Sequence, residues 1–354
     1  MKHWLYAALV ISGALLHGCA DADTTTHIRM WHFWSEPAQR RVLDSLISVF
    51  ESEHPGVDVE LTELTWTDGT SKLQLAFNAG TQPDVVHLGL DWFADFDAGG
   101  VFDSLPADIA TDGNAARWLV NVRALVGPNP APTIGACAVS DAHNVIKRIL
   151  PALWERGSTL YTRQPVSADL NSGLVTAFLR LHRDAPNLVL DRSRQLDELL
   201  LRGNVSGVFT GPWIVDMARQ RGVTLQTTVM PSILNADVLA VTRTSQHRDL
   251  SIALIRFLTR YDHARAFCER ISDAGFPADL ARAQSDTLFM RDSLLKGFLA
   301  TALQSRTLPR SATLLRIEPV IEEMISRACM TKDSSALSAL VASTRARVLR
   351  EESR

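Results

Sequence analysis

The sequence lacks the features that mark nucleotide-binding, nucleic-acid-binding and metal-dependent proteins. Neither common glycine-rich phosphate-binding loop is present, and no G-x-S-x-G turn marks a hydrolase nucleophile. The net charge of −3 provides no basic face for nucleic acid. The 10 histidines are scattered and the 4 cysteines show no C-x-x-C spacing, so we expect neither a metal nor a cofactor.

Long apolar runs are also absent, apart from one near the N-terminus. The run from Trp4 to Leu16 would reach roughly 20 Å as a helix, short of the roughly 30 Å of a bilayer core. With Lys2 before it, this run predicts a signal peptide over residues 1–18.

The end of this signal resembles a bacterial lipobox, because a small residue precedes Cys19. We therefore expect Cys19 to become the lipidated N-terminus of the mature chain, followed by a polar tether over residues 19–26. A plain signal peptide with an incidental cysteine is the alternative. The expected location is the cell envelope, with the protein lipid-anchored to a bacterial membrane on its periplasmic or extracellular side. Cys137, Cys268 and Cys329 remain, and we expect them to be small buried hydrophobes.

What the sequence does contain is an alternation of strands and helices, which predicts an α/β protein with a mainly parallel sheet covered by helices. The length of 354 residues favours two domains. After Asp249 the pattern is almost wholly helical, with stops near residues 275–277 and 308–309. The predicted strands cover 28–33, 57–65, 83–90, 205–211, 223–231 and 237–242, and the first helices cover 37–56, 68–80, 91–100 and 212–222.

Four tryptophans each follow a predicted strand: Trp34, Trp66, Trp92 and Trp213. In open parallel sheets, ligands bind outside the carboxyl ends of the strands, which is where these rings would gather. Acidic and hydroxyl residues lie beside them in sequence. Aromatic faces among hydrogen-bond acceptors suit a sugar, although each tryptophan taken alone could equally fill a core or a hinge.

The arrangement resembles the extracellular solute-binding proteins of ABC importers, the broad family that includes maltose-binding protein. The similarity covers nearly all of the chain and is most specific in the N-terminal block. The segments that carry it are FWSEP, the helix ending F-x-x-x-H-P-G, VDVELTELTW, NAGTQPDVV, LDWFADFDAGGVFDSL, RWLVNVRALV, GVFTGPWIV and SRTLPRS.

The resemblance implies two lobes, each a mainly parallel sheet flanked by helices, joined by a hinge of crossing segments. Lobe 1 would hold residues 27–119 and 240–304, lobe 2 residues 124–238 and 310–354, with crossings at 120–123, 239 and 305–309. After RALV the sequence departs from the family pattern, so lobe 2 is expected to be shortened and the role of Tyr161 is in doubt. The implied ligand-binding residues are Trp34, Glu36, Trp66, Asp91, Trp92, Trp118, Asn121, Arg123, Tyr161, Trp213 and Phe276.

The resulting hypothesis is a monomeric binding protein without catalysis that captures a mono- or oligosaccharide and delivers it to an ABC permease. Arg123 could also meet a carboxylate or phosphate, so sugar acids and glycerol phosphates stay open as ligands. Two alternatives remain: a degenerate or sensory lipoprotein, and a glycosidase using Glu36 and Asp91 as acid and base.

Overall fold

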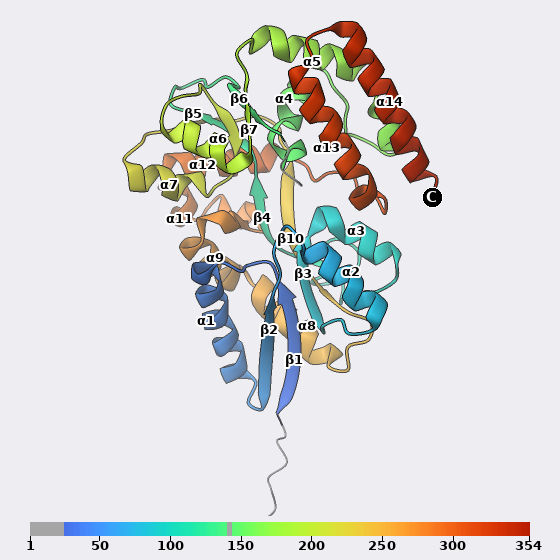
Figure 1. Cartoon of the computed structure of the whole chain (residues 1–354). Helices are drawn as coiled ribbons and strands as arrows, with labels where there is room; N and C mark the ends of the chain where they lie inside the picture. Colours follow the sequence, from blue (N-terminus) through green and yellow to red (C-terminus); the bar gives the residue numbers. More distant parts are fainter. Residues whose placement is uncertain (1–24, 140–143) are drawn as a thin grey trace, which may run out of the picture.

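The computed structural model describes residues 25–139 and 144–354. The predicted signal peptide, Cys19 and most of the tether lie outside the described residues. Figure 1 shows two lobes stacked along the long axis, with β1 starting at the far end of the lower, larger lobe. None of the helices in the described part of the chain combines the length and apolar character needed to cross a membrane.

The N-terminal block forms the alternating unit that its pattern predicts. Helix α1 begins at a proline and buries the apolar stripe of Leu43, Leu46, Ile47 and Phe50. Gly56, with a φ of +85°, then turns the chain into the next strand. The elements are β1 (Thr26–His32), α1 (Pro37–Glu53), β2 (Val57–Glu63), α2 (Gly69–Ala79), β3 (Val85–Gly89) and α3 (Leu90–Ala98).

A six-stranded sheet forms the centre of the larger lobe, in the order β11-β4-β10-β3-β1-β2. β1 is parallel to β2 and β3, whereas β10 lies antiparallel between β3 and β4, and β11 is antiparallel to β4. The sheet is therefore mixed, with β1 to β4 running one way and two strands returning against them. The further strands are β4 (Ala116–Val122), β10 (Leu234–Val241) and β11 (Phe276–Pro277).

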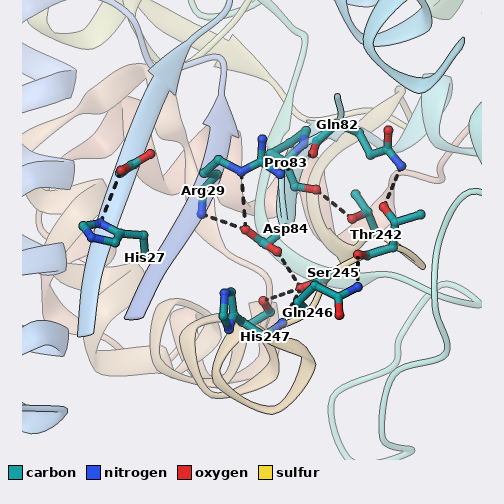
Figure 2. Close-up of polar contacts among 12 residues, drawn as sticks. His27, Arg29, Gln82, Pro83, Asp84, Thr242, Ser245, Gln246 and His247 are labelled. Atoms are coloured by element: carbon teal, nitrogen blue, oxygen red, sulfur yellow. Dashed lines mark hydrogen bonds and ion pairs between the residues drawn. The ribbon is translucent and has the colours of Figure 1, made fainter. Parts of the chain in front are cut away.

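A hydrogen-bond network around Asp84 fixes the start of β3 against β1 and the end of β10 (Figure 2). The Asp84 carboxylate accepts hydrogen bonds from the Arg29 N–H at 3.0 Å and the Ser245 hydroxyl at 2.7 Å. The Thr242 hydroxyl donates to the Pro83 carbonyl at 2.6 Å. The two bonds to the Asp84 carboxylate compensate the cost of burying it, since Asp84 is only 5% exposed. They also hold the strands in register, so that the opposite, carboxyl ends of β1 and β3 meet.

The smaller lobe contains a three-stranded sheet, β8-β5-β9, and the pair β6–β7. In contrast to the mainly parallel sheet expected for this lobe, β5 is antiparallel to both neighbours, and among the described strands of the lobe only β6 and β7 pair in parallel. The reason lies in the connections, because β5 enters the lobe directly from β4 while β8 and β9 lead back toward the hinge. The strands are β5 (Ala124–Gly127), β6 (Ala136–Ala138), β7 (Val189–Asp191), β8 (Val208–Thr210) and β9 (Gln226–Thr228).

Helices complete both lobes, and the nearly all-helical C-terminal part predicted from the sequence is confirmed. In Figure 1, α13 and α14 stand together on the smaller lobe. Up to the end of α7 the remaining helices are η1 (Ile146–Arg148), α4 (Leu150–Glu155), η2 (Val166–Asp169), α5 (Ser172–Asp184), α6 (Ser193–Leu201) and α7 (Ile214–Arg221). After β10 follow α8 (Arg248–Thr259), α9 (Tyr261–Arg270), η3 (Ser272–Ala274), α10 (Leu280–Ala283), α11 (Thr287–Met290), α12 (Ser293–Gln304), α13 (Leu314–Met330) and α14 (Ser334–Glu352).

Three connecting segments meet between the lobes. Arg123 separates β4 from β5, residues 229–233 link β9 to β10, and residues 305–313 link α12 to α13. Ser232 ties all three together: its hydroxyl donates to the Arg123 carbonyl, and its N–H donates to the Ser305 hydroxyl at 3.0 Å. These short segments form the connection between the two lobes and are called the hinge below.

The second crossing differs from the expected position. Leu239 lies inside β10, and the chain passes between the sheets at residues 229–233 instead. The polar residues Asn235 and Asp237 interrupt the apolar pattern of β10, which conceals the first half of the strand in the sequence. The other lobe boundaries stay a prediction.

Candidate functional site

Aromatic rings from the carboxyl ends of β1 and β2, together with Trp118 of β4, surround His87, which is itself fully buried in β3. The indole of Trp34 lies parallel to the imidazole, with centroids 5.9 Å apart and planes at 5°. Trp66 meets His87 edge-on at 6.2 Å and contacts Trp92 at 5.4 Å. Three of the four tryptophans that follow strands are therefore neighbours. The sequence-based prediction did not include His87 among these rings, although a single histidine within the apolar run PDVVHLGL could have indicated a buried polar residue there.

Burial divides this aromatic group. Trp34 is 3% exposed, Trp92 is 1% exposed and Trp118 of β4 is 0% exposed, whereas Trp66 is 42% exposed. Phe33 stacks against Trp66 with centroids 4.5 Å apart. Trp66 is thus the ring of this group that offers a face to a ligand in this conformation. The other rings form a packed floor, because they fill the space where the strand ends converge.

Trp213 belongs to the smaller lobe, on the other side of the junction from the aromatic group around His87. Polar groups of the smaller lobe hold its ring in place. A Cβ at Gly211 would lie 2.0 Å from the six-membered ring, so the glycine makes room for the indole. The indole N–H donates to Asp197 at 2.9 Å. Burial would raise the pKa of the Asp197 carboxyl, but the guanidinium of Arg148 and the indole N–H hold it below its usual value.

Arg123 is the cation at the centre of the hinge. Its side chain is largely buried, lies 4.4 Å from the centroid of the Trp213 ring, and donates a hydrogen bond to Asn121 Oδ1 at 3.0 Å. Burial and the neighbouring Arg148 lower the pKa of Arg123 to about 10, while Asp273 opposes the shift. Among the described residues its Nε has no hydrogen-bond partner. A charged donor in such a place suits an oxygen-rich ligand.

An ion pair joins the two lobes at the start of α3. Asp91 Oδ2 lies 2.7 Å from Lys147 Nζ of η1, and the two side chains are 14% and 13% exposed. Lys147 therefore occupies the space beside Asp91 where the sequence predicts a ligand. Lys147 was missed because it stands in a segment without a recognisable motif.

A second contact between the lobes lies one turn further along α3. Asp95 accepts a hydrogen bond at 3.3 Å from the N–H of Leu315, at the start of α13, where the helix dipole favours an acceptor. Burial raises the pKa of Asp95 to about 6, against the lowering effect of the Leu315 N–H. The smaller lobe thus holds α3 at two successive turns.

Carboxyl groups accumulate on the larger lobe's side of the hinge. Burial raises the pKa of Asp273 to about 6, with Asp237 and Glu36 adding to the rise and Arg123 opposing it. Gln39 donates a hydrogen bond to Asp273 at 3.3 Å. Glu36 itself is exposed. These oxygens are acceptors available to hydroxyl donors of a ligand.

Besides Trp34, Trp92 and Trp118, two further predicted contact residues lie in hydrophobic cores. Tyr161 is 1% exposed and packs in the core of the smaller lobe, where burial raises its pKa well above the usual value. Phe276 of β11 is fully buried against Phe289, with ring centroids 5.2 Å apart. In this conformation neither ring offers a surface to the junction.

The space beside Asp91 is small. The cavity beside Asp91 and Asn235 has a volume of about 20 Å³, which is room for a water molecule but not for a sugar. A cavity of about 350 Å³ lies between α7 and the segment from α9 to α12, with Arg219 and Glu269 in its wall. No predicted contact residue lines the larger cavity. A sugar can therefore reach Asp91 only if the lobes separate.

One cluster of possible metal ligands was missed, because its members come from neighbouring strands. His27 Nδ1 lies 2.9 Å from Asp58 and 3.3 Å from Glu60 on the surface of the larger lobe. His27 and Glu60 are exposed and Asp58 is half-buried, and such clusters commonly form surface ion pairs. We assign no metal to it.

Residues 33–132 match the family model described as bacterial extracellular solute-binding protein. Among curated proteins, the chain is 26% identical over 231 residues to an uncharacterized lipoprotein in the oleD 5′ region of Streptomyces antibioticus. That match covers 57% of this chain and 51%, about half, of the relative.

Solved structures share the fold of the whole described chain. The GacH receptor of Streptomyces glaucescens, solved unliganded and with acarbose, matches with a TM-score of 0.74 at 17% identity, covering 93% of this chain and 99% of that one. The maltose/maltodextrin-binding domain MalE of Bdellovibrio bacteriovorus, bound to maltotriose, matches with a TM-score of 0.71 at 15% identity, covering 92% and 100%. The predicted two-lobed α/β fold is confirmed, and the family resemblance is confirmed over residues 33–132.

Proposed function

Residues 33–132 carry the sequence signature of bacterial extracellular solute-binding proteins, and from this premise we propose that the protein captures a carbohydrate between its lobes and delivers it to an ABC permease. The observation that carries the proposal is the ion pair between Asp91 of the larger lobe and Lys147 of the smaller lobe. The exposed ring of Trp66 lies on the larger lobe near the same strand end, and the buried cation Arg123 lies at the hinge. An aromatic face, a carboxylate and two cations suit a ligand with an apolar ring face and many hydroxyls.

Binding would begin with separation of the lobes, which breaks the ion pair between Asp91 and Lys147. A sugar then stacks on the exposed face of Trp66, donates hydroxyl hydrogen bonds to Asp91 and accepts them from Lys147. Closure brings Trp213 and Arg123 against the other side of the ligand. The hinge segments around Ser232 are short and hydrogen-bonded to one another, which favours rotation of the lobes as rigid bodies.

The proposal includes the location and the partners. A lipid on Cys19 and the tether to residue 26 would hold a monomer at the membrane of the cell envelope, and the permease would recognise the closed, loaded form. No catalytic step is assigned. Glu36 is exposed and Asp91 is ion-paired, an arrangement that suits hydrogen-bond acceptance from a ligand.

A panel of ligands tests the function. Residues 20–354 are mixed with mono- and oligosaccharides, uronic acids and glycerol phosphates, while tryptophan fluorescence and the melting temperature are recorded. We expect a ligand that changes both signals in the wild type, with both effects weakened in Trp66→Ala. Trp31→Phe is the matched control, because Trp31 lies half-buried on β1, between β2 and β3. A panel without any response would instead favour a sensory or degenerate lipoprotein, and turnover of a sugar would favour a glycosidase.

A further inference from the structure

The guanidinium of Arg123 is a buried cation that forms no ion pair with any described residue. Arg123 is 8% exposed, and the hydrogen bond of its side chain to the described part of the chain runs from Nη1 to Asn121 Oδ1 at 3.0 Å. Burial lowers its pKa to about 10, which still leaves it charged at neutral pH. A buried charge is costly unless a partner compensates it.

The unpaired donors of Arg123 lie on one edge of the guanidinium. Nε is buried without a hydrogen-bond partner among the described residues, and Nη2, on the same edge, makes no hydrogen bond to any of them. Arg117 shows what this edge can hold, because its Nε lies 3.0 Å from Asp112 Oδ2 and its Nη2 lies 2.8 Å from Asp112 Oδ1. Two N–H groups at this spacing fit two oxygens of a carboxylate or a phosphate.

The other cations near Arg123 already have their partners. Arg123 and Arg148 lie 4.4 and 5.6 Å from the centroid of the Trp213 ring. Arg148 donates from Nη1 and Nη2 to the two carboxylate oxygens of Asp197, at 2.9 and 2.8 Å. Lys147 has its own ion pair across the junction. Arg123 is therefore the cation of this group to which the described residues supply no acid.

Asp273 balances part of this charge but does not take up the donors. Burial raises the pKa of Asp273 to about 6, and Arg123 opposes this rise, so the two groups attract each other at neutral pH. Asp273 accepts its hydrogen bond from Gln39, at 3.3 Å, and forms no ion pair with Arg123 within the described residues. Nε and Nη2 of Arg123 thus stay without an acceptor.

Three contacts fix the orientation of Arg123. The hydroxyl of Ser232 donates to its backbone carbonyl, Asn121 holds Nη1, and the indole of Trp213 covers the guanidinium. A side chain held in this way loses little conformational freedom when it binds a ligand. The open edge is therefore a preorganised pair of donors at the hinge.

We propose that the captured ligand carries an acidic group, a carboxylate or a phosphate on a sugar or polyol, and that Arg123 binds this group through Nε and Nη2. The inference rests on the proposed function, because it assigns the charge of the ligand that the lobes enclose. The acid enters when the lobes separate, and closure buries it together with Arg123. A neutral sugar leaves the Nε–H group buried and unpaired, so the site discriminates against it.

Pairs of ligands that differ in one acidic group test the inference on residues 20–354. The pairs are glucose and glucuronate, galactose and galacturonate, glycerol and glycerol phosphate, and methyl-esterified and free oligogalacturonates. Calorimetric titration measures the affinity for each member. We expect the acidic member of at least one pair to bind roughly tenfold or more tightly than its neutral partner. A preference confined to uronates identifies a carboxylate, and one confined to glycerol phosphate identifies a phosphate.

Substitutions assign this preference to the guanidinium. Arg123→Gln should bring the ratio of acidic to neutral affinity close to one, whereas Arg123→Lys should keep part of it, because lysine retains the charge without the two-donor edge. Arg306→Gln is the matched control and should leave the ratio unchanged. Arg306 also lies over an indole, 4.7 Å from the centroid of the Trp154 ring, but it is exposed.

The outcomes separate this inference from the function on which it rests. Neutral sugars that bind the wild type as tightly as their acidic partners would overturn the inference and leave the capture of a carbohydrate standing. An acidic preference that survives in Arg123→Gln would overturn the role of Arg123. If no member of any pair binds, the proposed function fails and the inference fails with it. The wild-type titrations decide the charge of the ligand without any substitution.

Discussion

Replacing Lys147 with methionine should open the ligand-free protein. Methionine keeps most of the apolar stem of the side chain but removes the ammonium group that meets Asp91 at 2.7 Å. In the closed form the carboxylate of Asp91 would then be largely buried without this partner. In an open form water would hydrate it, so the substitution favours separation of the lobes over unfolding.

The magnitude follows from the burial of the pair. A hydrogen bond between charged groups contributes about 1.5–3 kcal/mol, and exposed pairs contribute less because water screens them. The side chains of Asp91 and Lys147 are only 14% and 13% exposed, so we take about 2 kcal/mol. That corresponds to a roughly 30-fold change in the ratio of closed to open molecules.

Small-angle X-ray scattering measures the opening directly, as an increase in the radius of gyration of the ligand-free variant. Lys72→Met is the control, because Lys72 forms an ion pair at 2.9 Å with Asp68 within the larger lobe and with both side chains about half exposed. Asp91→Asn should open the molecule as Lys147→Met does. If both junction variants scatter like the wild type and like Lys72→Met, the ion pair does not hold the lobes together and the reasoning fails.

Three further substitutions probe the junction and its floor. Asp273→Asn should stabilise the protein by about 2 kcal/mol at pH 8 and hardly at pH 4. The pKa of Asp273 is raised to about 6, so the wild type loses stability as the pH rises through that value. Urea unfolding of both proteins measures this, and a difference that stays constant from pH 4 to pH 8 would contradict it. Gly211→Ala should cost about 1–3 kcal/mol and shift tryptophan emission, because the new methyl group displaces the Trp213 ring from Asp197; unchanged emission would contradict this. His87→Ala should cost about 3 kcal/mol and reduce the near-ultraviolet circular dichroism of the surrounding indoles, whereas an unaltered spectrum would mean that His87 does not order them.

The sequence predicts well the elements whose apolar residues repeat regularly. Helix α1 and the strands β1 to β3 have such patterns, and the meeting of Trp34, Trp66 and Trp92 follows from parallel strands that end at one edge. Which of these rings stays exposed cannot be predicted in the same way, since exposure depends on residues far away in the chain. Trp118 of β4 and Phe267 of α9, whose rings lie 5.2 Å apart, help to cover the buried rings of the aromatic group but do not cover Trp66.

Sequence patterns do not predict which charged residues form ion pairs across the junction between the lobes. Nothing in the run around Lys147 distinguishes it from a surface lysine, and only the closed arrangement of the lobes brings it to Asp91. The polar residues within β10 likewise make this strand hard to recognise in the sequence. In the structure β10 pairs with both of its neighbours, β3 and β4, along its length.

The most direct test of the central claim is a calorimetric titration of the protein with the carbohydrate that gives the largest response in the panel. The account predicts one binding site per chain, an affinity at least tenfold lower in Trp66→Ala and in Asp91→Asn, and no change in Trp31→Phe. Binding of equal strength in the wild type, Trp66→Ala and Asp91→Asn would place the ligand elsewhere on the molecule and contradict a carbohydrate site between the lobes.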